Sequence, residues 1–267
     1  MKKLATIFFL SLCSLCSYSQ GSDFGIMAGT SYYMGDLNPG KQFYSTRPAA
    51  GVLYRRNFNP RYSLKFSAYY GTIEAYDSES SSKAQQERNL HFKSDIYDFT
   101  GQIEFNFLPF VIGESWDYFS PYVFAGVSIF KYNPTAEFEG SWHELQPLKT
   151  EGKEYALIQG AFPFGLGLKL SIARNFALGV EWGLRKTFRD YLDDVSTVYA
   201  NPAEIRKANG EMAVILGDRS LNNEEEFINN EGRQRGNSKN NDWYSFAGLT
   251  LTYQIIAKEK CVGVRKK

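Results

Sequence analysis

A strict alternation of apolar side chains with small or polar ones, sustained over about ten residues at a time, constrains this chain more than any other feature. Residues 62–71 show it clearly, because Tyr, Leu, Phe, Ala and Tyr occupy every second position. Successive side chains of a β-strand point to opposite faces, so a period of two predicts a strand with one apolar face. Strands of soluble proteins usually have about five or six residues, whereas a tilted strand needs about ten to cross a membrane. The alternation therefore predicts membrane-spanning strands.

The same pattern recurs along the chain, and its repeats are separated by connections of two kinds. Short connections alternate with long polar ones, as expected when turns lie on one side of a membrane and loops on the other. The sequence predicts an all-β fold, a closed antiparallel transmembrane β-barrel of about eight strands with short periplasmic turns and long extracellular loops. The eight predicted strands are 24–33, 48–58, 62–71, 97–107, 122–132, 161–170, 176–185 and 243–255. The predicted long loops are 34–47, 74–94, 133–157 and 189–241.

The composition agrees with a barrel. The mean hydropathy of -0.38 excludes a bundle of membrane helices, but only alternate residues of a barrel strand face lipid. The chain has 18 Tyr and 21 Phe, and aromatic rings are typical of the boundary between lipid and water. Residues 155–173 are nearly uncharged and long enough for a membrane helix, yet their apolar residues fall at every second position. A strand is therefore the preferred interpretation.

The two ends of the chain differ from the region between them. Lys2 and Lys3 precede a short apolar run and a polar segment that ends at Gln20, the pattern of a secretory signal peptide. We therefore expect a signal peptide over 1–20, cleaved near Gln20, a barrel over 21–256 and a basic periplasmic tail over 257–267. Such a chain would be exported to the cell outer membrane, with lipid around the barrel.

The charge of the chain is balanced except in the tail. The net charge is +1 and falls to about −1 without the signal peptide, so a nucleic-acid partner is not expected. Cys261 is the one cysteine outside the first 20 residues. It is either a free thiol or a candidate for a disulfide with a partner, and both interpretations stay open. Besides Cys261, the tail has basic residues that could bind a partner. They are Lys258, Lys260, Arg265, Lys266 and Lys267.

Charged residues also occur on the predicted inward faces of the strands. They could line a charged channel or a proton path, or they could pair with one another in a packed interior. An eight-stranded barrel has room for little besides side chains, so we expect structural charge pairs and no pore. The residues concerned are Lys65, Asp98, Glu104, Lys169, Glu181 and Arg185. Gly165 and Gly167 on the same face are expected to make room for bulky neighbours.

Residues suited to catalysis or metal binding are sparse. His91 and His143 fall in predicted loops without partners at catalytic or zinc-binding spacing. Asp190, Asp193 and Asp194 could contribute to a calcium site, but a solvated loop is the preferred interpretation. The sequence thus predicts no enzyme, no catalytic or metal site, no cofactor and no small-molecule substrate.

The longest loop has one local signal of structure. Asn201 followed by Pro202 is typical of a helix start and predicts a short helix over 202–216. Residues 222–241 are polar and rich in Asn, and we expect them to be mobile.

Several segments, in order along most of the chain, resemble the PorG-like family. They are 33–38, 70–73, 120–127, 162–167, 185–196 and 240–244. That family comprises outer-membrane barrels of the type IX secretion system of Bacteroidetes. The resemblance implies a structural component that anchors or stabilises a periplasmic ring made of a lipoprotein and its partner subunit. Export of surface proteins, and gliding in motile species, would depend on it. The family has no catalytic residues to transfer.

The sequence leaves other functions open. The main alternative is a binding protein or adhesin that acts through the long outer loops. An outer-membrane enzyme such as a lipid A modifier or protease would need clustered His, Asp or Ser at the outer rim, and two isolated histidines argue against it. A passive porin is disfavoured by the narrow interior.

Overall fold

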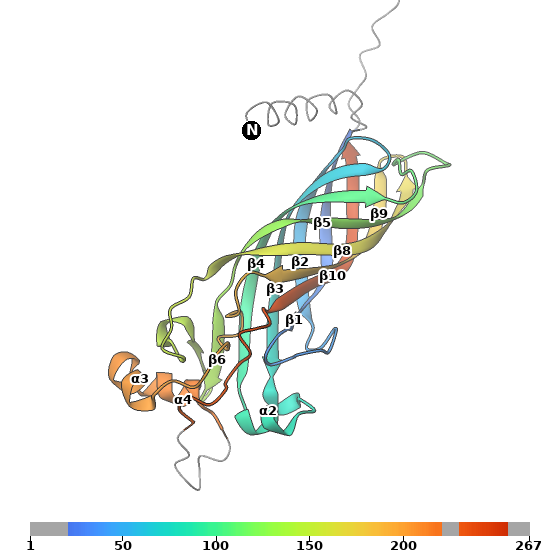
Figure 1. Cartoon of the computed structure of the whole chain (residues 1–267). Helices are drawn as coiled ribbons and strands as arrows, with labels where there is room; N and C mark the ends of the chain where they lie inside the picture. The colour runs from blue at the N-terminus through green and yellow to red at the C-terminus, as the bar shows by residue number, and fades with distance from the viewer. Residues whose placement is uncertain (1–20, 221–229, 256–267) are drawn as a thin grey trace, which may run out of the picture.

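The computed structural model describes residues 21–220 and 230–255, and in them eight long antiparallel strands close into a barrel (Figure 1). Each strand pairs with the next along the chain, and β1 pairs with β10 to complete the ring. This confirms the predicted fold class. The barrel strands are β1 (Gly21–Met34), β2 (Arg47–Asn57), β3 (Tyr62–Tyr76), β4 (His91–Asn106), β5 (Phe119–Lys131), β8 (Ile158–Ala173), β9 (Phe176–Thr187) and β10 (Trp243–Ile255).

The alternation in the sequence separates the two faces of the barrel wall. On β4, Phe99 and Ile103 are 64% and 61% exposed on the outer face, whereas Asp98 and Glu104 are fully buried inside. The other strands repeat this arrangement, so a broad apolar surface surrounds the barrel, and charged groups together with aromatic rings fill it. In water such an exposed apolar surface would be unfavourable, whereas next to hydrocarbon it is the favourable arrangement.

The two ends of the barrel are built differently (Figure 1). Connections 58–61, 107–118 and 174–175 lie at the end where β1 starts and β10 finishes, which we call the turn end. The other four connections gather at the opposite end, which we call the loop end. They contain η2 (Asp77–Glu79), α2 (Lys83–Arg88), β6 (Pro134–Phe138), β7 (Ser141–Glu144), η3 (Gln146–Leu148), α3 (Pro202–Asn209) and α4 (Glu211–Gly217).

The loop end holds more regular structure than the sequence predicts. Strands β3 and β4 continue pairing as far as Tyr76 and His91, within the predicted loop 74–94. The predicted loop 133–157 contains the β6–β7 hairpin, which pairs with β4 through Lys93 and Ser94. Alternation fails as a guide here because the loops cover both faces of the strands. Ile73, Glu74 and Ala75, for example, are consecutive and all buried.

The predicted helix in the longest loop is present, but as two helices. The Asn201 side chain accepts hydrogen bonds from the backbone N–H groups of Ala203 and Glu204 at 2.9 and 3.2 Å, which caps α3. Gly210 then ends α3 with a φ of +86°, a value that L residues rarely adopt, and α4 begins at once.

Several predictions fall on residues outside the described part of the chain. The signal peptide over 1–20 and the tail with Lys258, Lys260, Cys261, Arg265, Lys266 and Lys267 stay predictions. Of the segment expected to be mobile, residues 230–241 are described, and they are attached to their neighbours by hydrogen bonds from Asn237 to Asp36 and from Asn241 to Thr187. Among the described helices, none is both long and apolar enough to cross a membrane.

Glycines on the inner face of β8 make room for aromatic rings, as expected. A Cβ atom at Gly167 would lie 2.5 Å from the Tyr122 ring, and one at Gly165 would lie 2.6 Å from the Phe124 ring. The bulky inward rings of β5 therefore depend on the absence of side chains on the neighbouring strand.

We predict that Gly167→Val lowers the free energy of unfolding by about 1–3 kcal/mol, because the new side chain displaces Tyr122 in a packed interior. Urea unfolding of the barrel in detergent micelles measures the change. Leu168→Val on the outward face is the matched control, and equal midpoints for the two variants would contradict the prediction.

Candidate functional site

The polar interior of the barrel is organised around one carboxylate, that of Glu104. Its oxygens lie 2.6 Å from Lys169 Nζ, 2.8 Å from Arg55 Nε and 3.5 Å from Lys65 Nζ. Lys65 also contacts the carboxylate of Glu181. All five side chains are almost completely buried. Burial of single charges is costly, but this arrangement supplies each of them with an opposite charge.

Three further contacts involve the residues around Glu104. Arg55 lies 3.6 Å from Asp23, so it bridges two carboxylates. The Tyr122 hydroxyl donates to Glu181 at 2.7 Å. Lys169 lies 4.3 Å from the centroid of the Tyr122 ring, within cation–π range. We call Asp23, Arg55, Lys65, Glu104, Lys169 and Glu181 the interior charge cluster.

A second polar group lies nearer the loop end. Asp98 accepts hydrogen bonds from Tyr244 Oη at 2.7 Å and from Thr100 Oγ1 at 2.6 Å. Arg185 lies 3.7 Å from the same carboxylate and 4.8 Å from the centroid of the Phe246 ring. The structure thus places all six sequence-identified interior charges inside the barrel, in two groups.

Sequence reasoning missed Asp23 and Arg55, which belong to the interior charge cluster. Both lie on strands whose alternation is weak, because small residues such as Ala28 and Ala50 interrupt the large apolar ones on the outward face of β1 and β2. A usable signal existed on β2, since Arg55 falls between the positions of Val52, Tyr54 and the other residues of the apolar outward face. Arg55 therefore points inward, as Leu53 does.

We predict that Glu104→Gln lowers the free energy of unfolding by about 3–5 kcal/mol, because it leaves the buried Lys169 and Arg55 without their carboxylate. Chemical unfolding in micelles measures this loss. Glu154→Gln, which breaks the exposed pair with Lys149, is the control and should leave stability unchanged. A Glu104 variant as stable as the control would contradict the assigned role.

The loop end is closed by a second network, built on carboxylates that the sequence suggested were solvated. This expectation is wrong, because Asp190, Asp193 and Asp194 are 6%, 1% and 1% exposed. The Tyr33 hydroxyl, at the end of β1, donates to Asp193 at 2.5 Å and to Asp242 at 3.0 Å. Folding of the longest loop back over the barrel mouth buries these groups.

Further contacts fix this loop to its neighbours. Asp194 accepts hydrogen bonds from Tyr155 Oη at 2.6 Å and from Thr150 Oγ1 at 2.5 Å. Glu151 lies 3.0 Å from Arg235 Nη1. Burial raises the pKa of Asp194 to about 6 despite the nearby charge of Arg235. Burial also opposes ionisation of Glu151, but the charge of Arg235 and the hydrogen bonds from Ser196, Thr197 and Arg235 together lower the pKa of that carboxyl.

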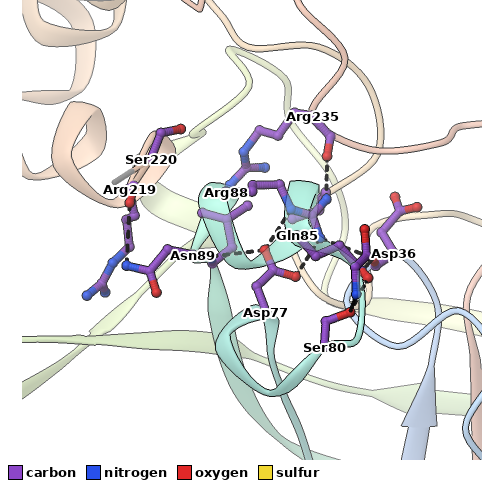
Figure 2. A network of polar contacts seen from close by, with 12 residues as sticks. Asp36, Asp77, Ser80, Gln85, Arg88, Asn89, Arg219, Ser220 and Arg235 are labelled. Carbon is purple, nitrogen blue, oxygen red and sulfur yellow. Dashed lines mark hydrogen bonds and ion pairs between the residues drawn. The ribbon is translucent and has the colours of Figure 1, made fainter. Parts of the chain in front are cut away.

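Arg88 connects the loops across the same end (Figure 2). Its guanidinium binds Asp77 through two hydrogen bonds of 2.7 Å and donates to the backbone carbonyl oxygens of Asp36 and Arg235. Gln85, one turn earlier on α2, also donates to the Asp36 carbonyl oxygen at 2.8 Å. One side chain therefore holds three separate loops together.

Among the described buried carboxylates of the loop end, Asp190 has the fewest polar contacts to offset the burial of its charge. Neither of its carboxylate oxygens has a hydrogen-bond partner among the described residues. Burial, followed by the charge of Asp36, raises the pKa of Asp190 to about 7. Between about pH 4 and 7 the folded chain therefore retains a proton that the unfolded chain releases. Stability contributed by this group is complete at low pH and is lost as the pH rises through 7.

We predict that Asp190→Asn stabilises the loop end at pH 8, by about 1–3 kcal/mol, and has little effect at pH 4. Hydrogen exchange of residues 188–196, with variant and wild type compared at each pH, measures the difference. The exposed Asp95→Asn is the control. Equal protection of variant and wild type at pH 8 would contradict the assignment.

The two histidines lie in strands, whereas the sequence placed them in loops. His91 begins β4, stacks on Tyr76 and accepts a hydrogen bond from the Glu137 N–H at 2.9 Å. His143 lies in β7, opposite Ala136 of β6. Among the described residues, no group of His, Cys, Asp or Glu has a geometry that could hold a metal ion.

The turn end is dominated by connection 107–118. Phe110 and Ile112 are buried and pack with Ala177 at the base of the barrel. The connection is also held by a hydrogen bond of 2.8 Å from the Gly113 N–H to Ser171 Oγ. On this fixed turn Trp116 is 94% exposed, the highest value among the large hydrophobic residues described.

A family described as "Domain of unknown function (DUF6089)" matches residues 1–211. The chain belongs to this family. No curated protein matches the sequence.

Solved structures with a similar fold are barrels of low sequence identity. Neisserial surface protein A is 8% identical, with 90% of this chain and 100% of that chain covered and a TM-score of 0.47. Ail of Yersinia pestis, in complex with a heparin analogue, is 13% identical, with 88% and 97% covered and a TM-score of 0.42. Outer Membrane Protein W of E. coli is 12% identical, with 88% and 98% covered and a TM-score of 0.39.

Proposed function

We propose that this DUF6089 family member is an outer-membrane β-barrel that serves as a structural anchor for a protein assembly in the periplasm. The apolar outer surface of the closed barrel supports the membrane location, since lipid is the environment in which such a surface is stable. The signal-peptide pattern over 1–20 supports export. The turn end would then face the periplasm and the loop end the cell exterior.

The interior charge cluster is the observation that carries the structural role. Its charged groups contact one another, as in the pairs Lys169–Glu104 and Lys65–Glu181, so they contribute to packing. Aromatic rings of β5 occupy the space beside the glycines of β8. A barrel filled in this way is suited to rigidity rather than to passage of solutes.

The turn end supplies a surface for a periplasmic partner. Trp116 projects from a connection that is much longer than the other two, and Tyr118 beside it is 50% exposed. Large aromatic side chains on a pre-organised support are typical anchors of protein interfaces. Phe110 and Ile112 hold the support in place. We therefore assign the partner contact to connection 107–118.

We further propose that the partner is the periplasmic ring of a type IX secretion system, formed by a lipoprotein and its partner subunit. The resemblance of the sequence to the PorG-like family supports this finer assignment. The tail over 257–267 would start from the same end of the barrel. Cys261 remains the candidate for a disulfide with the partner, beside docking by Lys258, Lys260, Arg265, Lys266 and Lys267.

We predict that Trp116→Ala reduces copurification of periplasmic ring subunits at least tenfold after detergent extraction, because it removes the aromatic anchor of the interface. Trp116 is exposed, so its removal should leave the packing of the barrel unchanged. Export of surface proteins should fall in parallel. Trp142→Ala, at a half-exposed position of β7 on the loop end, is the matched control. Full copurification with Trp116→Ala would place the contact elsewhere.

A second candidate function is binding of an external ligand by the loops. It is favoured by a cavity of about 440 Å³ whose lining includes Gln85, Tyr199, Arg233 and Gln234, beside the network of Figure 2. The Trp116→Ala variant separates the two functions. An adhesin would keep protein export intact in the Trp116→Ala strain, whereas loss of export supports the anchor.

A further inference from the structure

A second cavity, of about 520 Å³, opens on the outer side of the barrel wall at the loop end. Its walls come from the end of β9, the start of β10 and the connections that follow β1 and precede β10. Two lysines, Lys186 and Lys239, line it together with the apolar side chains of Leu184 and Trp243. The cavity therefore combines positive charge with an apolar wall that continues the lipid-facing surface.

The apolar wall is part of the barrel strands. Lys186 and Trp243 are directly opposite each other on β9 and β10, and Lys186 Nζ lies 5.4 Å from the centroid of the Trp243 ring. The ring in turn meets Phe164 edge-on, with centroids 5.9 Å apart. Leu184 precedes Lys186 by two positions and thus shares its outward face. The ammonium group lies just above an aromatic and aliphatic surface.

The second lysine is carried by a connection that is fixed to the barrel rim. Asn241 Nδ2 donates to the Thr187 carbonyl oxygen at 3.0 Å, and the Thr187 N–H donates to the Asp242 carbonyl oxygen at 3.0 Å. Lys239 lies within a turn between Asn237 and Asn240 that is closed by a hydrogen bond of 3.0 Å. The backbone that carries each lysine is thus attached to the barrel rim, and both lysines line the same cavity.

The charge balance at the cavity is positive. In the described part of the chain, no carboxylate lies within ion-pairing distance of the ammonium of Lys186 or Lys239. One carboxylate, that of Asp36, also lines the cavity, but it accepts the Asn237 N–H at 2.9 and 3.1 Å. Burial raises the pKa of Asp36. One carboxylate against two ammonium groups leaves the cavity positive.

We propose that this cavity binds the phosphate-bearing headgroup of a lipid in the outer leaflet, with Lys186 and Lys239 on the phosphate and the acyl chains along Leu184 and Trp243. Lysine is a common phosphate ligand, and charge attraction is stronger at the edge of a membrane than in water. The apolar wall below the lysines fits a lipid and would be unexplained for a free anion. We therefore assign a phosphorylated glycolipid of the lipid A class.

The proposal rests on the outer-membrane location but not on the anchor role, so the two can fail separately. The experiment uses the full mature chain, folded in detergent and incubated with bisphosphorylated lipid A or with the same lipid after removal of its phosphates. Native mass spectrometry counts the retained lipid. Heat-modifiable migration on gels shows that each variant is folded, and the Trp116→Ala assay reports on the anchor role independently.

We expect wild type to retain phosphorylated lipid A and the double variant Lys186→Glu with Lys239→Glu to retain at least tenfold less. The matched control is Lys83→Glu with Lys207→Glu, which changes the net charge equally on the exposed faces of α2 and α3. If the double variant does not fold, the Gln pair at the same positions replaces it. Retention equal to the control, equal retention of the phosphate-free lipid, or displacement by millimolar inorganic phosphate would each overturn the proposal.

Discussion

The pairing of β1 with β10 is the constraint on which the rest of the structure depends. Inside a membrane, each unpaired backbone N–H or C=O costs several kcal/mol, so a sheet that crosses lipid must close on itself. Closure with eight strands leaves a narrow interior, and alternation then directs every second side chain into it. The polar residues on that inner face must neutralise one another, because little water can reach them.

This requirement explains why Glu104 has such a central position. A single carboxylate that contacts Lys65, Lys169 and Arg55 allows three strands to carry inward cations, with Glu181 and Asp23 completing the balance. Replacing such a cluster by apolar residues could give an equally stable core. The polar version instead keeps the inner faces distinct from the lipid-facing ones, so a strand that slips by one residue would expose charge to lipid.

The sequence predicted the barrel strands well and the loop end poorly, for one physical reason. Along 97–107 one face meets lipid and the other meets polar groups, so the local alternation of residue types predicts which side chains are buried. Asp193, in contrast, is buried because Tyr33 and Asp242, distant in the sequence, meet it over the barrel mouth. No local pattern encodes such a contact. The cap at Asn201 was predictable because it involves only neighbouring residues.

The rigid wall and the two different ends have a joint consequence for function. Because the interior is occupied, a ligand or partner can act only on the outside of the barrel or at its ends. Trp116 lies on a fixed turn at one end, and Lys186 lies on the outer wall near the other. A lipid held at the loop end would set the depth and tilt of the barrel, and therefore the height at which Trp116 meets the periplasm. The membrane contacts and the proposed partner contact would then be coupled mechanically through one stiff body.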